Sequence, residues 1–230
     1  MQGAESREQD ATPHSMPHAF PSYSKRSAIK SYTGIDKNKD LIDVLSQQYK
    51  NAEFILQNIP PLTNTEDNSF DSVISFQVIE HIKNDKLYVE EIYRVLKPSG
   101  KAIITTPNIN MSLTRNPWHI REYTEEGLHS LFKARFNKVV IKGVYGNEKV
   151  MNYYYKNKKT VTRFKKFDIL NLEYLLPRFM LQLPYDLLNR LNRRLLLKKN
   201  NNLVTDINYT DYYLDGASES CLDFFCVVEK

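Results

Sequence analysis

The stretch FDSVISFQVIEHIKNDKLYVEEIYRVLKPSGKAIITTPN, residues 70–108, decides the fold. Residues 72–76 form a short apolar run rich in β-branched side chains, which predicts a buried strand. Residues 102–106 repeat this pattern after a turn that contains Pro98 and Gly100. With a helix between them, the two runs form a strand–helix–strand crossover, so we expect the two strands to be parallel.

The intervening residues have the pattern of an amphipathic helix. Asn84 and Asp85 are typical of a helix start, as a capping residue and a first-turn acid. The apolar face consists of Tyr88, Ile92, Val95 and Leu96, at helical spacing. The segment therefore predicts a βαβ unit.

The composition is typical of a globular protein. The chain has 230 residues, of which 41% are hydrophobic and 26% charged, which is enough for one α/β domain with an appendage. No apolar run of about 18 residues predicts a membrane-spanning helix, and the first residues do not resemble a secretory signal. Cys221 and Cys226 lie five apart in one apparent strand, so we expect their side chains to point to opposite faces and not to form a disulfide. Such a pattern is typical of a protein in a reducing cytoplasm.

The chain divides into four predicted parts: a disordered leader (1–22), a core (23–152), a basic amphipathic helical insertion (153–215) and a final core strand (216–230). Within the core, we expect strands at 31–35, 53–56 and 136–143, and helices at 37–49 and after Thr124. We expect the strands at 31–35, 72–76 and 102–106 to belong to one sheet.

Residues 69–108 resemble the second half of a class I S-adenosylmethionine-dependent methyltransferase of the small-molecule branch. The similarity lies in Ser69-Phe70-Asp71, in VIEHI at 78–82, in RVLKP at 94–98 and in TPN at 106–108. This resemblance implies an α/β, Rossmann-like, mostly parallel sheet with flanking helices and an antiparallel last strand. It also implies S-adenosylmethionine as cofactor and methyl transfer to an oxygen, nitrogen or carbon of a small-molecule acceptor.

The first strand and glycine-rich loop of that family have no counterpart before Asp36. Glycine is needed in such a loop because the backbone approaches the cofactor closely. Only Gly3 and Gly34 precede Asp36. Two interpretations remain open: the chain is a fragment of a complete enzyme, or it is a degenerate member of the family.

Asp36, at the end of YTGID, is the first cofactor candidate. An acid at the end of the second strand accepts hydrogen bonds from ribose hydroxyls in adenosine sites. The alternative is that Asp36 caps the following helix. By resemblance, Asn58 and Ile59 would contact the adenine, or else they belong to an ordinary surface loop.

Ser75, Phe76 and Gln77 end the strand at 72–76, and they are the candidates for the methionine end of the cofactor. Ligands in open α/β sheets lie at the carboxyl ends of the strands. Phe76 belongs to the core instead if its side chain turns inward.

Glu80 and His81 invite a metal interpretation, because some relatives bind a divalent ion with this pair and a Glu three residues earlier. Here that place is Gln77, a poor ligand for a hard cation, and no second His is near in sequence. We therefore predict no metal, and expect the pair to hydrogen-bond a loop and shape the pocket.

His119 lies in NPWHIREY, residues 116–123, which resembles the acceptor-side loop of the family. His119 is a candidate general base for the acceptor's proton, and His81 is the competing candidate. The alternative for His119 is a hydrogen bond that anchors the loop. Arg121 and Glu122 are expected to pair with each other or with the loop backbone.

The basic charge is concentrated in residues 156–199, where 12 Lys and Arg face three acids, a local net charge of 12 − 3 = +9. This distribution argues against a nucleic-acid partner and for a local anionic contact. The segment is expected to form a lid, to bind a partner or to rest on an anionic membrane, which allows a peripheral location. A non-catalytic binding or membrane-associated module is thus the alternative function.

Overall fold

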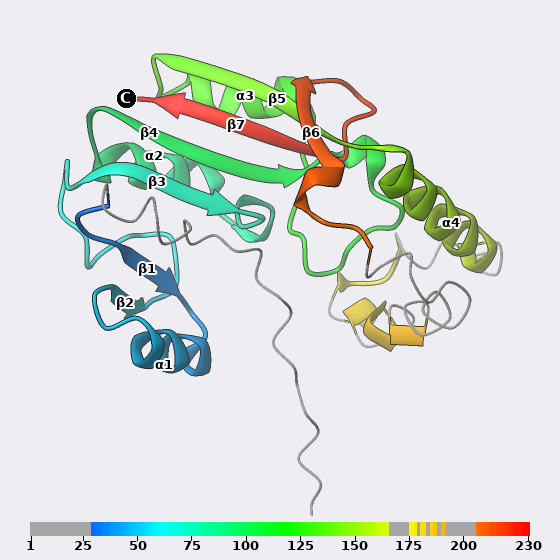
Figure 1. Cartoon of the computed structure of the whole chain (residues 1–230), viewed down its shortest axis with the longest axis horizontal. Coiled ribbons are helices and arrows are strands. Elements are labelled where there is room, and N and C mark those ends of the chain that lie inside the picture. Colours follow the sequence, from blue (N-terminus) through cyan, green and yellow to red (C-terminus); the bar gives the residue numbers. More distant parts are fainter. Residues whose placement is uncertain (1–28, 166–174, 179, 183–184, 188–189, 192–205) are drawn as a thin grey trace, which may run out of the picture. The chain divides into compact units, whose positions relative to one another are not determined.

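The computed structural model describes residues 29–165, 175–178, 180–182, 185–187, 190–191 and 206–230 (Figure 1). The chain divides into two compact units, Met1–Gln57 and Asn58–Lys230. The predicted leader, 1–22, and much of the predicted basic insertion lie outside the described residues. No described helix is both long enough and apolar enough to cross a membrane.

The smaller unit contains a parallel strand pair and one helix. Strand β1 (Thr33–Asp36) pairs with β2 (Glu53–Leu56), and α1 (Lys39–Gln48) connects them. Asn38 caps α1 by accepting a hydrogen bond from the Leu41 backbone N–H at 3.2 Å. Gly34 is required in β1 because a Cβ atom there would lie 2.7 Å from the Phe54 ring.

The larger unit contains a five-stranded sheet in the order β3-β4-β7-β5-β6. Its strands are β3 (Phe70–Phe76), β4 (Leu96–Pro107), β5 (Lys138–Gly146), β6 (Tyr212–Gly216) and β7 (Asp223–Glu229). Its helices are α2 (Asp85–Val95), α3 (Glu125–Lys133) and α4 (Glu148–Lys165), with short 3-10 turns η2 (Ile79–His81), η3 (Ile109–Met111) and η4 (Tyr209–Asp211).

Strand directions confirm the predicted fold class. β3 and β4 are parallel, as the βαβ pattern requires, and β7 is antiparallel to both β4 and β5. Three of the five strands, β3, β4 and β5, therefore run in one direction, and β7 is the predicted antiparallel last strand. The helix between β3 and β4 begins at the predicted cap, where Asn84 accepts from the Leu87 N–H at 3.1 Å.

The expectation that β1 shares a sheet with β3 and β4 was wrong. β1 pairs only with β2 among the described strands, and β3 pairs only with β4. In the doubly wound order 3-2-1-4-5, strand 1 lies between strands 2 and 4 and bonds to both. The residues that the structure describes include no such strand, so no described ladder joins the two sheets.

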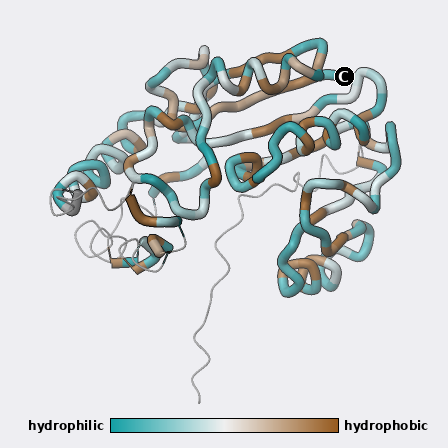
Figure 2. The backbone as a smooth tube through the Cα atoms, turned by 180° about the vertical axis from the view of Figure 1, so that it is seen from behind, coloured by the Kyte–Doolittle hydropathy of each residue, from teal (hydrophilic) through white to brown (hydrophobic). Residues whose placement is uncertain are grey.

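The hydrophobic core lies between the five-stranded sheet and the helices α2 and α3, which cover one face of it (Figure 1). Figure 2 shows apolar residues along the strands, seen from behind. The core residues include Ile92, Leu96, Ala102, Ile104, Leu128, Phe132, Phe224, Cys226 and Val228. Each large apolar side chain buried in this way stabilises the fold by about 1.5–3 kcal/mol.

Three local predictions differ from the structure. β4 begins at Leu96, so the expected Pro/Gly turn is the start of the strand, with Ser99 at φ 64°. β6 lies inside the range predicted as an insertion, because Tyr212–Gly216 extends the sheet by pairing with β5. Cys221 precedes β7 rather than lying in it, although both cysteines are free and buried.

Candidate functional site

The first part of the site is the carboxyl end of β3. Phe76 is 40% exposed, so its side chain does not belong to the core. Gln77 follows with φ 55°, a left-handed conformation that is uncommon for a residue other than glycine. Its side-chain amide donates to Asp223 Oδ1 at 3.3 Å. The Ser75 hydroxyl, in contrast, is buried and forms a hydrogen bond with the Tyr88 hydroxyl at 2.7 Å.

Asp223 was not among the residues singled out from the sequence. It begins β7 and thus lies at the edge of the sheet where β3 and β4 end. Burial raises the pKa of its carboxyl to about 6, against the effect of the hydrogen bond from Gln77, and nearby Glu80 adds to the increase. Only the sheet order brings Asp223 to this edge.

Glu80 lies in the turn η2 directly after β3 and is fully buried, with 0% exposure. Its Oε2 accepts a hydrogen bond from the Thr106 hydroxyl at 3.0 Å, whereas Oε1 is buried without a hydrogen-bond partner in the described structure. Burial raises the pKa of this carboxyl, and its own backbone N–H, the Thr106 hydroxyl and the two nearby histidines oppose the increase only in part.

The loop 116–123 packs directly against this turn. The Glu80 carbonyl accepts from the backbone N–H of Ile120 at 2.7 Å. A ring nitrogen of His81, Nδ1, lies 2.9 Å from the Trp118 carbonyl, which can only accept, so this nitrogen carries the proton. Glu80 and His81 therefore bind a loop, as expected from the sequence.

His119 is brought against His81 by this loop. The two rings meet edge to face, with centroids 4.9 Å apart. His119 Nδ1 lies 2.6 Å from Glu122 Oε1, and Nε2 lies 2.8 Å from the Asn116 side-chain nitrogen. Because an ionised carboxylate accepts and an amide nitrogen donates, these contacts place a proton on Nδ1 and leave the lone pair on Nε2.

Arg121 does not pair with Glu122, which was one of the two alternatives expected for it. Arg121 forms an ion pair with Asp85 and donates to the Lys83 carbonyl at 3.0 Å. Burial disfavours the Asp85 carboxylate, but hydrogen bonds from Arg121 and Tyr123 outweigh this effect and lower its pKa. Glu122 is thereby left for His119 and for the Ser112 hydroxyl, which donates to its other oxygen.

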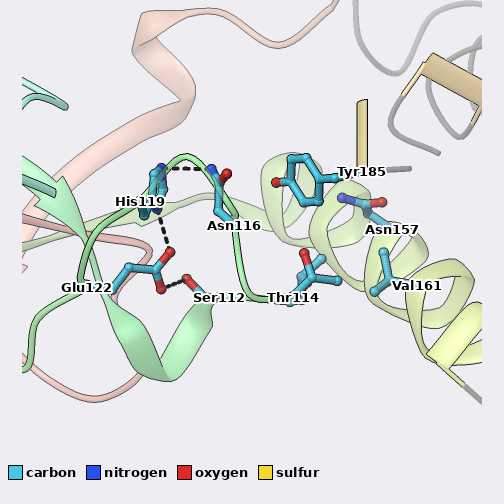
Figure 3. Close-up of a pocket in the computed structure, with 9 residues that line it drawn as sticks. Ser112, Thr114, Asn116, His119, Glu122, Asn157, Val161 and Tyr185 are labelled. Atoms are coloured by element: carbon cyan, nitrogen blue, oxygen red, sulfur yellow. Dashed lines mark hydrogen bonds and ion pairs between the residues drawn. The ribbon is translucent and has the colours of Figure 1, made fainter. Parts of the chain in front are cut away.

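A polar cavity of about 180 Å³ lies beside His119 and Glu122 (Figure 3). The residues that line it are Ser112, Leu113, Thr114, Asn116, His119, Glu122, Asn157, Val161 and Tyr185. Figure 3 shows the linked side chains of Ser112, Glu122, His119 and Asn116 on one side of it, opposite Asn157 and Val161 of α4.

Two residues of the predicted insertion also contact the loop 116–123. The Arg178 guanidinium donates to the Ile120 carbonyl at 2.6 Å, and the Trp118 indole donates to Asp186 at 3.3 Å. The described part of the insertion is thus attached to the loop 116–123.

The cofactor candidates near the N-terminus lie as follows. Asp36 is half buried at the end of β1, and its Oδ1 accepts from the Asn38 backbone N–H at 2.7 Å. The helix cap considered as the alternative role of Asp36 is supplied by Asn38 instead. In the larger unit, Asn58 is exposed, whereas Ile59 is partly buried and packs against the hydrophobic core.

Comparisons with known proteins agree with this architecture. The fold is similar to the crystal structure of a SAM-dependent methyltransferase from Archaeoglobus fulgidus, with a TM-score of 0.50 at 15% identity over 86% of this chain and 75% of that one. At this identity the similarity shows the fold alone: an α/β, Rossmann-like domain.

Sequence comparison relates part of the chain to methyltransferases. Residues 18–104 match the model of a protein family described as "Methyltransferase domain". The chain is 34% identical over 117 residues to a "Probable S-adenosylmethionine-dependent methyltransferase" from Mycobacterium tuberculosis, covering 48% of this chain and 42% of that protein. It is 30% identical over 86 residues to the mitochondrial "Ubiquinone biosynthesis O-methyltransferase" of Rattus norvegicus, covering 34% of this chain and 25% of that protein.

Over the matched part of its length, the chain is therefore related in sequence to S-adenosylmethionine-dependent methyltransferases. The aligned residues span less than half the length of these curated relatives.

Proposed function

We propose that this protein transfers a methyl group from S-adenosylmethionine to a small-molecule acceptor that binds in the cavity beside His119. The observation that carries this proposal is the hydrogen-bonded His119–Glu122 pair, whose side chains border a polar cavity on the loop that follows β4. The relationship to methyltransferases supports the reaction class.

The residues present fit the cofactor in part. S-adenosylmethionine would supply a methyl group already activated by its sulfonium. The Asp36 carboxylate uses Oδ1 locally and retains a second oxygen with which to accept from ribose hydroxyls. The exposed Asn58 suits a contact with adenine, and the Phe76–Gln77 turn suits the methionine end.

Two of the proposed cofactor contacts are weakened by the packing. The Ser75 hydroxyl is bound to the Tyr88 hydroxyl inside the core, so Ser75 would contribute its backbone rather than its side chain. Ile59 packs against the same core and would offer the adenine only the part of its side chain that stays accessible.

On the acceptor side, Glu122 holds the Nδ1–H of His119 and so keeps the lone pair on Nε2. This nitrogen would take the acceptor's proton once the Asn116 amide, its present partner, moves away. His81 is less suited to this role, because it does not line the cavity. The cavity's hydroxyl and amide groups favour a hydroxyl or amine as the methylated group, and a protein named as an O-methyltransferase is among the relatives.

Isothermal titration with S-adenosylmethionine, followed by a turnover assay over candidate phenols and amines, tests the proposal. We expect cofactor binding, and a loss of turnover of about 100-fold in His119→Ala with unchanged cofactor affinity. The matched control is His129→Ala, since His129 is exposed on α3 outside the cavity. Absence of cofactor binding by the wild type would overturn the proposal, and unchanged turnover in His119→Ala would remove this residue from the reaction.

The remaining proposals concern location. We infer a reducing cytoplasmic environment from the free cysteines Cys221 and Cys226, and contact of residues 156–199 with anionic lipid from the charge of +9. Sedimentation with anionic vesicles tests the second: salt-sensitive binding is expected, and equal binding to neutral vesicles would contradict it.

A further inference from the structure

Three side chains with metal-binding chemistry converge at the junction of η2 and the loop 116–123. Glu80, His81 and His119 each offer one ligand atom, and these atoms all lie within 4.8 Å of one another. The sequence argued against a metal because no second His was near His81. The fold supplies that second His from a position 38 residues further along the chain, so this argument no longer holds.

An independent observation points to a ligand at the same place. Glu80 is 0% exposed, and its Oε1 is buried without a hydrogen-bond partner in the described structure. A buried carboxylate oxygen left unpaired is costly unless a cation or a donor compensates it. The Nε2 of His81 lies 3.9 Å from Oε1, beyond hydrogen-bond distance.

The surroundings of both histidines favour metal ligation. Metal-binding histidines usually donate the N–H of their other ring nitrogen to a carbonyl or carboxylate, which fixes the ring and the tautomer. His81 Nδ1 lies 2.9 Å from the Trp118 carbonyl. His119 Nδ1 lies 2.6 Å from Glu122. In each ring, Nε2 is the nitrogen that keeps a lone pair.

We propose that Glu80 Oε1, His81 Nε2 and His119 Nε2 bind a divalent transition-metal ion of the zinc type. Two imidazoles and one carboxylate are a common ligand set for zinc, whereas magnesium and calcium prefer oxygen ligands. Gln77 stands where some relatives have a Glu. The loss of this carboxylate argues against a hard cation but not against zinc, which the two histidines and Glu80 can bind. Three protein ligands leave the fourth tetrahedral position open for water or for an oxygen of the acceptor.

Binding requires the ligand side chains to rotate toward one another. Tetrahedral zinc at about 2.0–2.2 Å from each ligand places the ligand atoms about 3.3 Å apart. The separation of 3.9 Å between Glu80 Oε1 and His81 Nε2 would shorten by about half an ångström, and a separation at the 4.8 Å limit of the cluster would shorten by about 1.5 Å. At His119, the ion would replace the Asn116 amide as the partner of Nε2.

Metal binding does not rest on the proposed methyl transfer, because it is measured without cofactor or acceptor. Both proposals use His119 Nε2, and its lone pair cannot bind an ion and accept a proton at the same time. If both hold, the bound ion, rather than the free imidazole, is the group that faces the acceptor.

The test uses the full chain, stripped with a chelator and then titrated with Zn²⁺ by calorimetry and with Co²⁺ by visible absorption. We expect one equivalent of metal per chain and the intense absorption of tetrahedral Co²⁺, which Zn²⁺ then displaces. Both His81→Ala and Glu80→Gln should weaken binding by at least about 10-fold, and Glu122→Gln by about 10-fold or more through the orientation of His119.

Controls separate this site from other histidines. His129→Ala should bind as the wild type does, because His129 lies outside the cluster. The His81 side chain is 42% exposed, so its truncation is compatible with folding, which circular dichroism checks. No metal bound by the wild type, or wild-type affinity in both His81→Ala and Glu80→Gln, would overturn the proposal.

Discussion

Two acidic residues follow parallel strands at corresponding places, one in each unit, and their environments differ. Asp36 ends β1, is half buried, and accepts a hydrogen bond from the Asn38 N–H two residues later. Glu80 follows β3, is fully buried, and has one oxygen bound by Thr106 and the other without a described partner. A position after a strand thus does not define a role. The carboxylate of Asp36 is partly exposed and can bind a polar ligand, whereas the buried Oε1 of Glu80 requires a donor or a cation.

The largest expected difference between the two units is in the stability lost when a buried isoleucine is truncated. Ile92 of α2 is 1% exposed within a large cluster, whereas Ile42 of α1 is 7% exposed and is the buried residue of its helix in the smaller unit. We expect Ile92→Ala to lower the free energy of unfolding by about 4 kcal/mol and Ile42→Ala by about 2 kcal/mol, because the second site can collapse. Urea denaturation measures both, with exposed Val44→Ala as control. Equal losses would contradict the difference between the units.

Asp223, which lies close to Glu80, should make the stability of the larger unit depend on pH. Its folded-state pKa of about 6 exceeds the ordinary value of 3.8, so the folded state holds a proton that the unfolded state has lost. Stability should therefore fall as the pH rises from about 4 to 6, by up to about 3 kcal/mol. Asp223→Asn should remove this loss and stabilise the protein at pH 7. Thermal melts across this pH range measure it, and parallel pH profiles for the two proteins would refute the assignment.

Removing the donor to Glu80 should have a smaller effect. In Thr106→Val the second carboxylate oxygen also loses its partner, and we expect a loss of about 1–2 kcal/mol in unfolding free energy above the pKa of Glu80, measured with a chelator present. Thr105→Val is the matched control, since successive side chains of a strand point to opposite faces. If the two valine variants lose the same stability, the hydrogen bond to Glu80 is not the cause.

The smallest stability effect is expected at Asp36. Asp36→Asn keeps an acceptor for the Asn38 N–H, so the change in unfolding free energy should be no more than about 0.5 kcal/mol. Affinity for S-adenosylmethionine should nevertheless fall about 10-fold or more, because a charged acceptor of ribose hydrogen bonds is lost. Calorimetry measures the affinity. A large loss of stability with unchanged affinity would show that Asp36 serves α1 alone.

Local chemistry predicted most of the secondary structure. The Asn84 cap, the apolar spacing of α2 and the β-branched runs of β3 and β4 depend on neighbouring residues, and the structure confirms them. The predictions failed where long-range pairing decides. The sequence of β6 was predicted to belong to a helical insertion, but it forms a strand because it pairs with β5. β1 would share a sheet with β3 only if a further strand lay between them.

The sequence by itself determined the βαβ unit at 70–108, its likeness to a methyltransferase, and the candidates Asp36, His81 and His119. The tertiary structure alone decided which of these groups meet. It placed His119 against His81, assigned Arg121 to Asp85 rather than Glu122, and brought Asp223 beside Gln77. The physical reason is that capping and periodicity act within a few residues, whereas burial and side-chain pairing depend on segments that only the folded chain brings together.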